Sequence, residues 1–375
     1  MREVVVLGAG LHRYGVFPHK SFVELGVTAI RRALDDAGCH WRDIEAVYCG
    51  TARLGMAAGH HICRVLGSTG LAMTNVENAS ASGSSALREA YLAVAAGAHD
   101  VVLALGVDKL GARPERVLQE DPEGKAETHR KLPVHAFAAL ARQYMQACGM
   151  TREQLAQVSV KNHYHASLNP YAHFQTAVRL EEVLQARPVV EPFTVLHCCP
   201  WDEGAAAVVV AARAVAARFT RQPCPTLVAS VLQSIPNAAL DPVWSPVHLT
   251  AVVARQAYAR AGYGPEDLHL IELHDAFSIE EVVYYEALGL VAAGEGPRLI
   301  VDGDTTLAGR LPVNSSGGLT AMGHPLGPTG LGQIAEILWQ MRRTAGQRQV
   351  ARQVRVALAH MVGAGGVCAI HVLRL

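Results

Sequence analysis

The most reactive pattern in the sequence is a serine within a run of small residues at positions 75–86. Ser80 follows an apolar stretch typical of a strand, at residues 71–76, and precedes a long Ala-rich helical stretch at residues 82–96. A side chain on such a strand-to-helix turn faces the positive end of the helix dipole, where a developing negative charge is stabilised. Type and position therefore make Ser80 a candidate nucleophile.

Three further segments bring reactive residue types directly after apolar runs. His274 begins a His-Asp-Ala-Phe run after a strand predicted at residues 268–273, and Asn314 begins an Asn-Ser-Ser-Gly-Gly run that leads to His324. Gly363 begins a Gly-Ala-Gly-Gly run between two predicted strands. Because binding and catalytic residues gather on loops at strand ends, the conjunction of these segments indicates an active site.

The elements that must position these residues follow a regular rhythm, which predicts a layered α/β fold. Strands are expected at residues 3–9, 44–49, 71–76, 101–106, 205–211, 226–231, 268–273, 354–359 and 367–373, and helices at residues 22–37, 82–96, 249–261, 278–288 and 329–343. Residues 3–9 are expected to lead into a Gly-Ala-Gly run at the strand end.

Residues 107 to about 195 interrupt this rhythm and are rich in Arg, Glu, His and Pro. Such a stretch is typical of an inserted lobe, which we expect to be mainly helical and more exposed than the rest. The predicted organisation is an N-terminal half (residues 1–110 and 196–222), an inserted lobe (residues 111–195) and a C-terminal half (residues 223–375).

The C-terminal half repeats the N-terminal half at an offset of 224 residues. Ala-Gly at 37–38 followed by Asp-Ile at 43–44 matches Ala-Gly at 261–262 followed by Asp-Leu at 267–268. Internal duplication is the economical explanation. It predicts two βαβ-rich halves stacked back to back with helices between their sheets, in five layers of the order α-β-α-β-α.

The composition excludes several classes of protein. Lys and Arg number 33 and Asp and Glu also number 33, so the net charge is zero and no basic field favours nucleic acid or an anionic membrane surface. No apolar run is long enough to span a membrane, and the N-terminus enters a strand directly, so we expect a cytoplasmic protein. Its partners should be small molecules or other subunits.

The eight cysteines show neither a Cys-x-x-Cys pair nor zinc-finger spacing. This predicts reduced, mostly buried thiols and no metal site. The adjacent pair Cys198-Cys199 is interpreted as packing.

The four reactive segments, in this order, resemble the thiolase superfamily over essentially the whole chain. The most specific signature is Asn-x-x-Gly-Gly followed after four residues by Gly-His-Pro-x-Gly, and it occurs at residues 314–327. The His-Asp-x-Phe run at His274 is similar to the sterol-carrier-protein and archaeal branch. Residues 80–83 match the family's Cys-x-Ser-Gly turn, in which a CoA thioester acylates the cysteine. The resemblance implies a duplicated thiolase fold, coenzyme A as cosubstrate and no permanently bound cofactor.

The resemblance also implies a role for each site residue. His324 would take the proton of the nucleophile and help to bind the thioester oxygen, and His274 would form the other side of that oxyanion hole. The backbone amides of Ser80 and of the Gly363 region would form a second hole for the acyl-enzyme oxygen. Asn314 belongs to the same set of oxyanion and backbone residues.

Two departures from the family pattern concern proton transfer and the nucleophile. The cysteine that handles the α-proton of the second acyl-CoA is matched by Met361, and the alternative cysteine of the sterol-carrier branch is matched by Ala276. Neither side chain carries a proton, and His360, a strand neighbour of Met361, is expected to point to the opposite face. Ser80 replaces the nucleophilic cysteine, so it needs general-base help from His324.

Three functions are consistent with these residues. The first is a thiolase-type acyltransferase that forms or cleaves a carbon–carbon bond beside a CoA thioester, with Ser80, native or introduced, in the place of the cysteine. The second is a retro-aldol acyl-CoA lyase, which needs no covalent acyl carrier. The third is a catalytically silent subunit of a thiolase-like complex, in which the histidines and glycine loops would be expected to erode. We expect the first, because these residues are intact.

Ligand and partner sites are expected at the inserted lobe and at one sheet edge. Arg113, Arg130 and Lys131 are candidates to bind the phosphates of coenzyme A, and a solvated charged face is the alternative for each. By the resemblance, the chain forms a homodimer, or a heterotetramer with a small partner that combines a zinc ribbon and an OB fold. The apolar strand at residues 71–76 suits the dimer edge.

Overall fold

The computed structural model describes residues 1–110, 125–236 and 245–375, with residues 125–133 and 245 described by their backbone alone. The strands are β1 Val4–Gly15, β2 Ala46–Gly50, β3 Ala72–Val76, β4 Val101–Asp108, β5 Pro188–Val190, β6 Phe193–Thr194, β7 Glu203–Ala212, β8 Thr226–Ser234, β9 Leu270–Glu272, β10 Val356–Gly363 and β11 Val367–Arg374. The helices are α1 Phe22–Ala37, α2 Ala58–Leu66, α3 Ser82–Ala96, α4 Lys125–Cys148, α5 Arg152–Ser167, α6 Leu180–Gln185, α7 Arg213–Ala216, α8 Ser245–Ala261, α9 Ser278–Ala287, α10 Gly296–Val301 and α11 Thr329–Arg342.

The two halves of the chain have the same strand topology. In the N-terminal half β1 pairs antiparallel with β7, β7 antiparallel with β4, and β4 parallel with β2. In the C-terminal half β8 pairs antiparallel with β11, β11 antiparallel with β10, and β10 parallel with β9. The halves meet where Val5 of β1 pairs with Thr226 of β8, which joins them in the order β3-β2-β4-β7-β1-β8-β11-β10-β9. This repeated order confirms the duplication predicted from the sequence.

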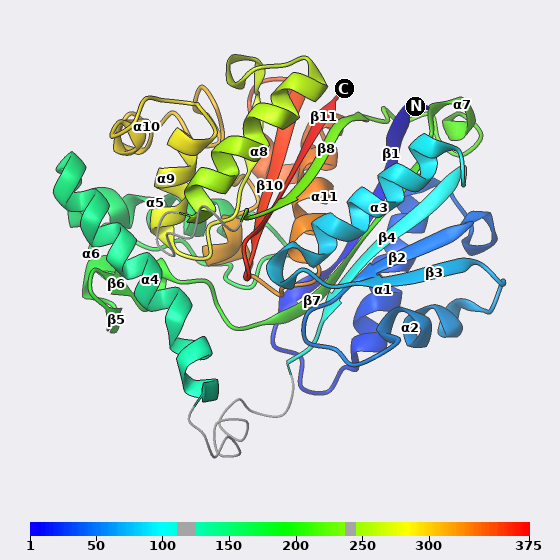
Figure 1. Ribbon diagram of the computed structural model, residues 1–375, viewed down its shortest axis with the longest axis horizontal. Helices are drawn as coiled ribbons and strands as arrows, with labels where there is room; N and C mark the ends of the chain where they lie inside the picture. The colour runs from blue at the N-terminus through cyan, green and yellow to red at the C-terminus, as the bar shows by residue number, and fades with distance from the viewer. Residues whose placement is uncertain (111–124, 237–244) are drawn as a thin grey trace.

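Helices α3 and α11 form the middle layer of the molecule. Each contacts strands of both halves, α3 against β4 and β8 and α11 against β7 and β10, and Figure 1 shows them among the strands of both halves. Helix α1 covers the outer face of β1, β7 and β4, and α8 covers the outer face of β8 and β11. The layers therefore follow the predicted order α-β-α-β-α.

Strand β1 shows how the sequence produces these layers. Val4 and Val6 are buried in the core that contains α3 and α11, whereas Val5 and Leu7 are buried in the core that contains α1. Successive side chains of a strand point to opposite faces, so a continuous apolar run serves two cores at once.

The Gly-Ala-Gly run at residues 8–10 lies inside β1, and the prediction that the strand ends there is wrong. A Cβ atom at Gly8 would lie 2.4 Å from the backbone nitrogen of Ala37, and one at Gly10 would lie 2.3 Å from that of Ala33. These glycines therefore allow α1 to approach the sheet closely.

The described part of the predicted lobe, residues 125–195, is mainly helical and its described side chains are more often exposed than those of the rest, as expected, but helix α5 is an exception. Asn162 and His165 of α5 are fully buried, and α5 packs against the π-helical turn Gly318–Met322 of the C-terminal half. Helix α5 is thus part of the core. The boundaries of the three predicted parts stay a prediction. Among the described residues, no helix is long and apolar enough to cross a membrane.

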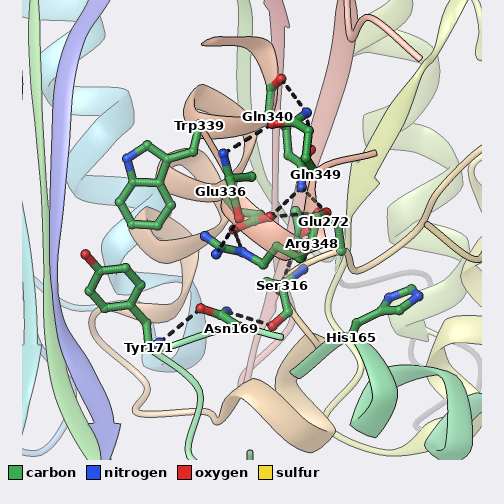
Figure 2. A network of polar contacts seen from close by, with 12 residues as sticks. His165, Asn169, Tyr171, Glu272, Ser316, Glu336, Trp339, Gln340, Arg348 and Gln349 are labelled. Carbon is green, nitrogen blue, oxygen red and sulfur yellow. Dashed lines mark hydrogen bonds and ion pairs between the residues drawn. The ribbon is translucent and has the colours of Figure 1, made fainter. Parts of the chain in front are cut away.

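A buried cluster of two glutamates anchors the start of the loop at residues 314–328. Figure 2 shows Glu272 of β9 and Glu336 of α11 beside Arg348 and Ser316. The Ser315 hydroxyl lies 2.9 Å from a Glu272 oxygen and 3.1 Å from a Glu336 oxygen, and Arg348 Nε donates to Glu336 at 2.8 Å. Burial, and then the charge of Glu336, raise the pKa of Glu272 to about 8.

We predict that Glu272→Gln removes a pH dependence of stability. A carboxyl group whose pKa is raised by folding stabilises the fold while it is protonated, and this contribution is lost as the pH rises through about 8. The variant should melt like the wild type near pH 4, and about 2 °C above it near pH 9, as measured by calorimetry. Glu295→Gln, at an exposed carboxylate, is the control and should show no such divergence. Parallel melting curves of Glu272→Gln and wild type at all pH values would refute the prediction.

Candidate active site

Ser80 lies on a tight turn between β3 and α3. Ala79 adopts a left-handed backbone conformation with φ 48°, and residues 79–81 form a single 3-10 turn. The Ser82 hydroxyl accepts from the Asn78 amide at 2.9 Å and donates to the Ala79 carbonyl at 2.6 Å, which closes the turn. A left-handed alanine is strained, so this turn persists because its neighbours hold it. The result is a Ser80 side chain fixed near the N-terminus of α3.

The Ser80 hydroxyl is hydrogen-bonded to His324. Ser80 Oγ lies 2.9 Å from His324 Nε2, and His324 Nδ1 lies 3.0 Å from the Thr329 hydroxyl. That hydroxyl donates its own proton to the carbonyl of Pro325 at 2.7 Å, so it accepts from Nδ1 and the imidazole proton resides on Nδ1. Nε2 therefore presents a lone pair to the Ser80 hydroxyl. The geometry is that of a serine with its general base.

The electrostatics of His324 agree with this tautomer. Burial, and then the electrostatic interaction with His274 and Arg53, hold the pKa of His324 well below its usual range. Both ring nitrogens have neutral hydrogen-bond partners, and no carboxylate among the described residues is hydrogen-bonded to the ring. His324 therefore stays unprotonated at neutral pH and is available to accept a proton.

Glycines allow the segment that carries Ser80 and the segment that carries His324 to approach each other closely. A Cβ at Gly83 in α3 would lie 2.3 Å from the carbonyl oxygen of Gly327, and a Cβ at Gly330 in α11 would lie 2.2 Å from the Ser84 hydroxyl. The middle-layer helices thus approach each other backbone to backbone. This close approach places the loop of His324 over the turn of Ser80.

His274 lies beside His324 and has a carboxylate partner. The two rings are perpendicular, with their centroids 5.3 Å apart. His274 Nδ1 lies 3.0 Å from Glu280 Oε1, and the side chains of both residues are buried. Glu280 also accepts from the Phe277 amide at 2.9 Å and from the Tyr284 hydroxyl at 3.2 Å. Sequence reasoning missed Glu280. The signal that could have found it is its place six residues after His274, in the first turn of the helix that follows.

Asn314 holds the strand end that carries His274, and its predicted oxyanion role stays a prediction. Its Oδ1 accepts from the backbone amide of Leu273 at 2.8 Å, and its Nδ2 donates to Glu281 at 2.8 Å. Neither bond is directed at Ser80 or His324. Asn314 is fully buried and serves as a positioning residue.

A web of buried polar residues ties the loop of His274 to the loop of His324. Asp275 accepts from the Leu319 amide at 2.6 Å and from the Thr320 hydroxyl at 2.8 Å. Asn162 of α5 donates to Asp275 and to Glu281, each at 2.9 Å. Burial, and then the charge of Glu281, raise the pKa of Asp275. These contacts fix the relative positions of the two histidines.

Gly363 ends β10 directly against the Ser80 turn. A Cβ there would lie 2.3 Å from the carbonyl oxygen of Asn78 and 3.4 Å from the backbone nitrogen of Ala81. The predicted contribution of the Gly363 region to an oxyanion hole stays a prediction. The structure brings the two segments into contact.

The residues at the expected acid–base positions are buried and inert. Met361 is fully buried and Ala276 is 8% exposed. His360 points away from the site, as expected for the next residue in a strand, because its Nε2 lies 2.9 Å from the hydroxyl of Thr250 in the outer helix α8. None of these three side chains therefore offers an exchangeable proton to the site.

The segment at residues 198–202 forms a further wall of the site that sequence reasoning missed. Asp202 is fully buried and accepts from the backbone amide of His324 at 3.1 Å. Burial raises the pKa of Asp202 to about 6. The packing interpretation is confirmed for Cys198, which packs in the core of the C-terminal half, while the Cys199 amide donates to Ala276 at 2.8 Å. No metal-ligand pattern or charge run flagged Asp202 in the sequence.

The predicted phosphate-binding residues cannot be placed at this site. Arg113 lies outside the described residues, and Arg130 and Lys131 belong to α4 but are described by their backbone alone. Within the described residues, no group of three or more His, Cys, Asp or Glu side chains is arranged to hold a metal ion.

Comparison with known proteins gives matches over the whole chain. Residues 4–214 match the family model of the thiolase N-terminal domain, and residues 241–373 match that of the thiolase C-terminal domain-like family. The chain is 39% identical to an acetyl-CoA acetyltransferase of Methanothermobacter thermautotrophicus over 99% of both chains. It is 34% identical to sterol carrier protein 2 of Bos taurus over 97% of this chain and 70% of that protein.

A solved structure described as Ltp2-ChsH2(DUF35) aldolase has a similar fold. Its TM-score is 0.85 at 24% sequence identity, and the match covers 99% of this chain and 98% of that one. At this identity the likeness concerns the fold alone.

Proposed function

Because this chain belongs to the thiolase superfamily, in the branch of the archaeal acetyl-CoA acetyltransferases and sterol carrier protein 2, we propose that it is an acyl-CoA C-acyltransferase that uses Ser80 as its acyl acceptor. It would form or cleave a carbon–carbon bond beside a CoA thioester. The observation that supports this most directly is the hydrogen bond from Ser80 to His324 Nε2, with the tautomer of His324 set by Thr329.

The proposed acylation uses the residues in their observed positions. As Ser80 Oγ bonds to the thioester carbonyl carbon, its proton passes to His324 Nε2 and the carbonyl electron pair moves to the oxygen. Backbone amides at Ser80 and near Gly363 are proposed to stabilise that oxyanion. Collapse of the intermediate breaks the carbon–sulfur bond, and the departing CoA thiolate takes the proton from His324.

Serine changes the energetics of the second half of the reaction. An oxygen ester is more stable than a thioester, so transfer of the acyl group from Ser80 back to CoA is uphill. The acyl-serine should therefore accumulate, which makes it measurable by intact-protein mass spectrometry.

We predict that incubation with acetyl-CoA adds one acetyl mass to the wild type and none to Ser80→Ala. Ser80→Cys should acylate and turn over faster than the wild type, by about tenfold or more, because its thiolate is the better nucleophile and leaving group. Product release is followed as free CoA with a thiol reagent. Cleavage of a β-ketoacyl-CoA or β-hydroxyacyl-CoA by Ser80→Ala at the wild-type rate would sink the proposal.

That last outcome would favour the second candidate, a retro-aldol acyl-CoA lyase. The observation in its favour is the combination of a serine nucleophile with Met361 and Ala276 at both cysteine positions. An aldol cleavage requires a base and an enolate-stabilising site and no covalent acyl carrier, so neither loss would matter to it.

We further propose that the chain works in an assembly, either a homodimer or a complex with a small zinc-ribbon and OB-fold partner. Among the described strands, β3 is at the end of the sheet and pairs with β2 alone, and its residues Ala72, Thr74 and Asn75 are exposed. An open strand edge of this kind is a surface for pairing with a second copy. The aldolase of similar fold bears the names of two components, which motivates the second form. Light scattering on the purified chain measures its oligomeric state, and a dimeric mass supports the homodimer.

A further inference from the structure

The proposed reaction needs a group that moves the α-proton of the acyl-CoA, and the usual thiols for it are missing. Met361 and Ala276 have no exchangeable side-chain proton. His360 is directed to Thr250 in the outer layer. The Cys199 thiol cannot act as a base, because burial, and then the nearby carboxylate of Asp202, raise its pKa well above the usual range. His324 is already assigned to the proton of Ser80.

His274 is the remaining histidine at this site, and its partner defines its protonation. Glu280 accepts from the Phe277 amide and from the Tyr284 hydroxyl, so it acts as an acceptor toward Nδ1 of His274 as well. The imidazole proton therefore lies on Nδ1, and Nε2 has a lone pair. No described residue is hydrogen-bonded to that Nε2. The atom is also not one of the fully buried, unpaired side-chain atoms, so its surface is accessible. Nε2 is thus open to a substrate.

The two histidines differ in the charge that they can hold. When His274 takes a proton on Nε2, the resulting imidazolium faces the buried carboxylate of Glu280 at 3.0 Å. When His324 takes a proton, its Nδ1 faces only the Thr329 hydroxyl. An opposite charge at this distance stabilises an imidazolium while it exists during the reaction. The two histidines therefore have different capacities. His324 can accept the Ser80 proton transiently, whereas His274 can hold a proton whose charge is balanced by Glu280.

We propose that His274, supported by Glu280, carries the α-proton of the acyl-CoA substrate. In the condensing direction the α-carbon–hydrogen bond breaks, its electron pair forms the enolate of the thioester, and the proton moves to Nε2 of His274. In the cleaving direction the same imidazolium returns the proton to the enolate carbon. His274 is the catalytic residue and Glu280 the positioning residue. This inference rests on the proposed function, since it assigns a step of the same reaction.

The test is exchange of the α-protons of acetyl-CoA with D2O, measured by mass spectrometry over a range of pH. Glu280→Gln keeps the shape and removes the charge, and it should slow exchange by about 10²-fold. It should also move the acidic limb of the pH profile to lower pH, because the imidazolium loses its carboxylate partner. A purely structural role of Glu280 would not shift that limb.

Glu286→Gln is the matched control on the same helix. Glu286 likewise accepts from a tyrosine hydroxyl, that of Tyr144, and from the backbone amides of Gly294 and Gly296, but it has no histidine partner. Its variant should exchange at the wild-type rate. Should Glu280→Gln not fold, as judged by its melting curve, His274→Gln takes its place and should abolish exchange.

Wild-type exchange in Glu280→Gln, an unshifted pH profile, or exchange by a folded His274→Gln would each overturn the inference. Its failure is distinguishable from failure of the proposed function. The acyl-Ser80 mass is measured on the same samples without D2O, and an absent acyl mass removes the proposed function whatever the exchange rate.

Discussion

Replacing His324 by asparagine is expected to slow the acylation of Ser80 by about 10²–10⁴-fold, the usual contribution of a general base. Asparagine retains a polar side chain near Ser80 but cannot take its proton. Serine depends on this help more than cysteine does, because its hydroxyl is not ionised at neutral pH. The measurement is the time course of acetyl-enzyme formation by rapid-quench mass spectrometry.

Substitutions of Thr329 test whether the tautomer of His324 matters for the acylation of Ser80. Thr329→Val removes the hydroxyl that accepts from His324 Nδ1, so the imidazole is no longer restricted to the tautomer with a free Nε2. Thr329→Ser keeps that hydroxyl and is the control. We expect a loss of about tenfold or more in acylation rate for the valine variant and near-wild-type acylation for the serine variant. Acylation of His324→Asn at the wild-type rate would show that Ser80 is activated by another group.

Replacing Gly363 by alanine is expected to lower the acylation rate by about 10²-fold although the residue provides no side chain, because displacements of about 1 Å at a reacting centre have effects of this size. The new Cβ would lie 2.3 Å from the carbonyl oxygen of Asn78 and 3.2 Å from the Cβ of Ala81. Both neighbours belong to the turn that presents Ser80. Since backbone atoms cannot rotate away, either β10 or the turn must shift.

Gly55→Ala is the control for Gly363→Ala, because a Cβ at Gly55 would have no heavy atom within 4 Å. It should acylate like the wild type. Melting curves of both variants separate misplacement of the turn from unfolding. An unchanged acylation rate in Gly363→Ala would mean that the turn adapts without moving Ser80.

Much of the fold could be predicted from the sequence because its signals are local. Residues 22–37 and 82–96 follow helical periodicity, end at glycines, and form α1 and α3 with the expected bounds. The duplication was visible as a repeated helix end and strand start, and the strand pairings repeat it. The strand end at Ala9 was wrongly predicted, because a glycine that permits close helix packing has the same letter as a glycine in a turn.

Some residues of the candidate site could likewise be predicted from the sequence, and others could not. Ser80, His274, His324 and Gly363 could be named because each stands in a short motif after an apolar run. Asp202 and Glu280 could not, because their importance comes from a partner in another segment and no spacing rule connects them. The burial of α5, which brings Asn162 to Asp275, was hidden by the polar composition of that helix.

The sequence by itself determined the family and the layered fold and made Ser80 the candidate nucleophile, since these depend on residue types and on spacing along one segment. Only the tertiary structure decided which nitrogen of His324 faces Ser80 and which carboxylate supports His274. Hydrogen bonds act over about 3 Å in space and are independent of separation along the chain. His274 and His324 are the same residue type, and their partners Glu280 and Thr329, one a carboxylate and one a hydroxyl, distinguish them.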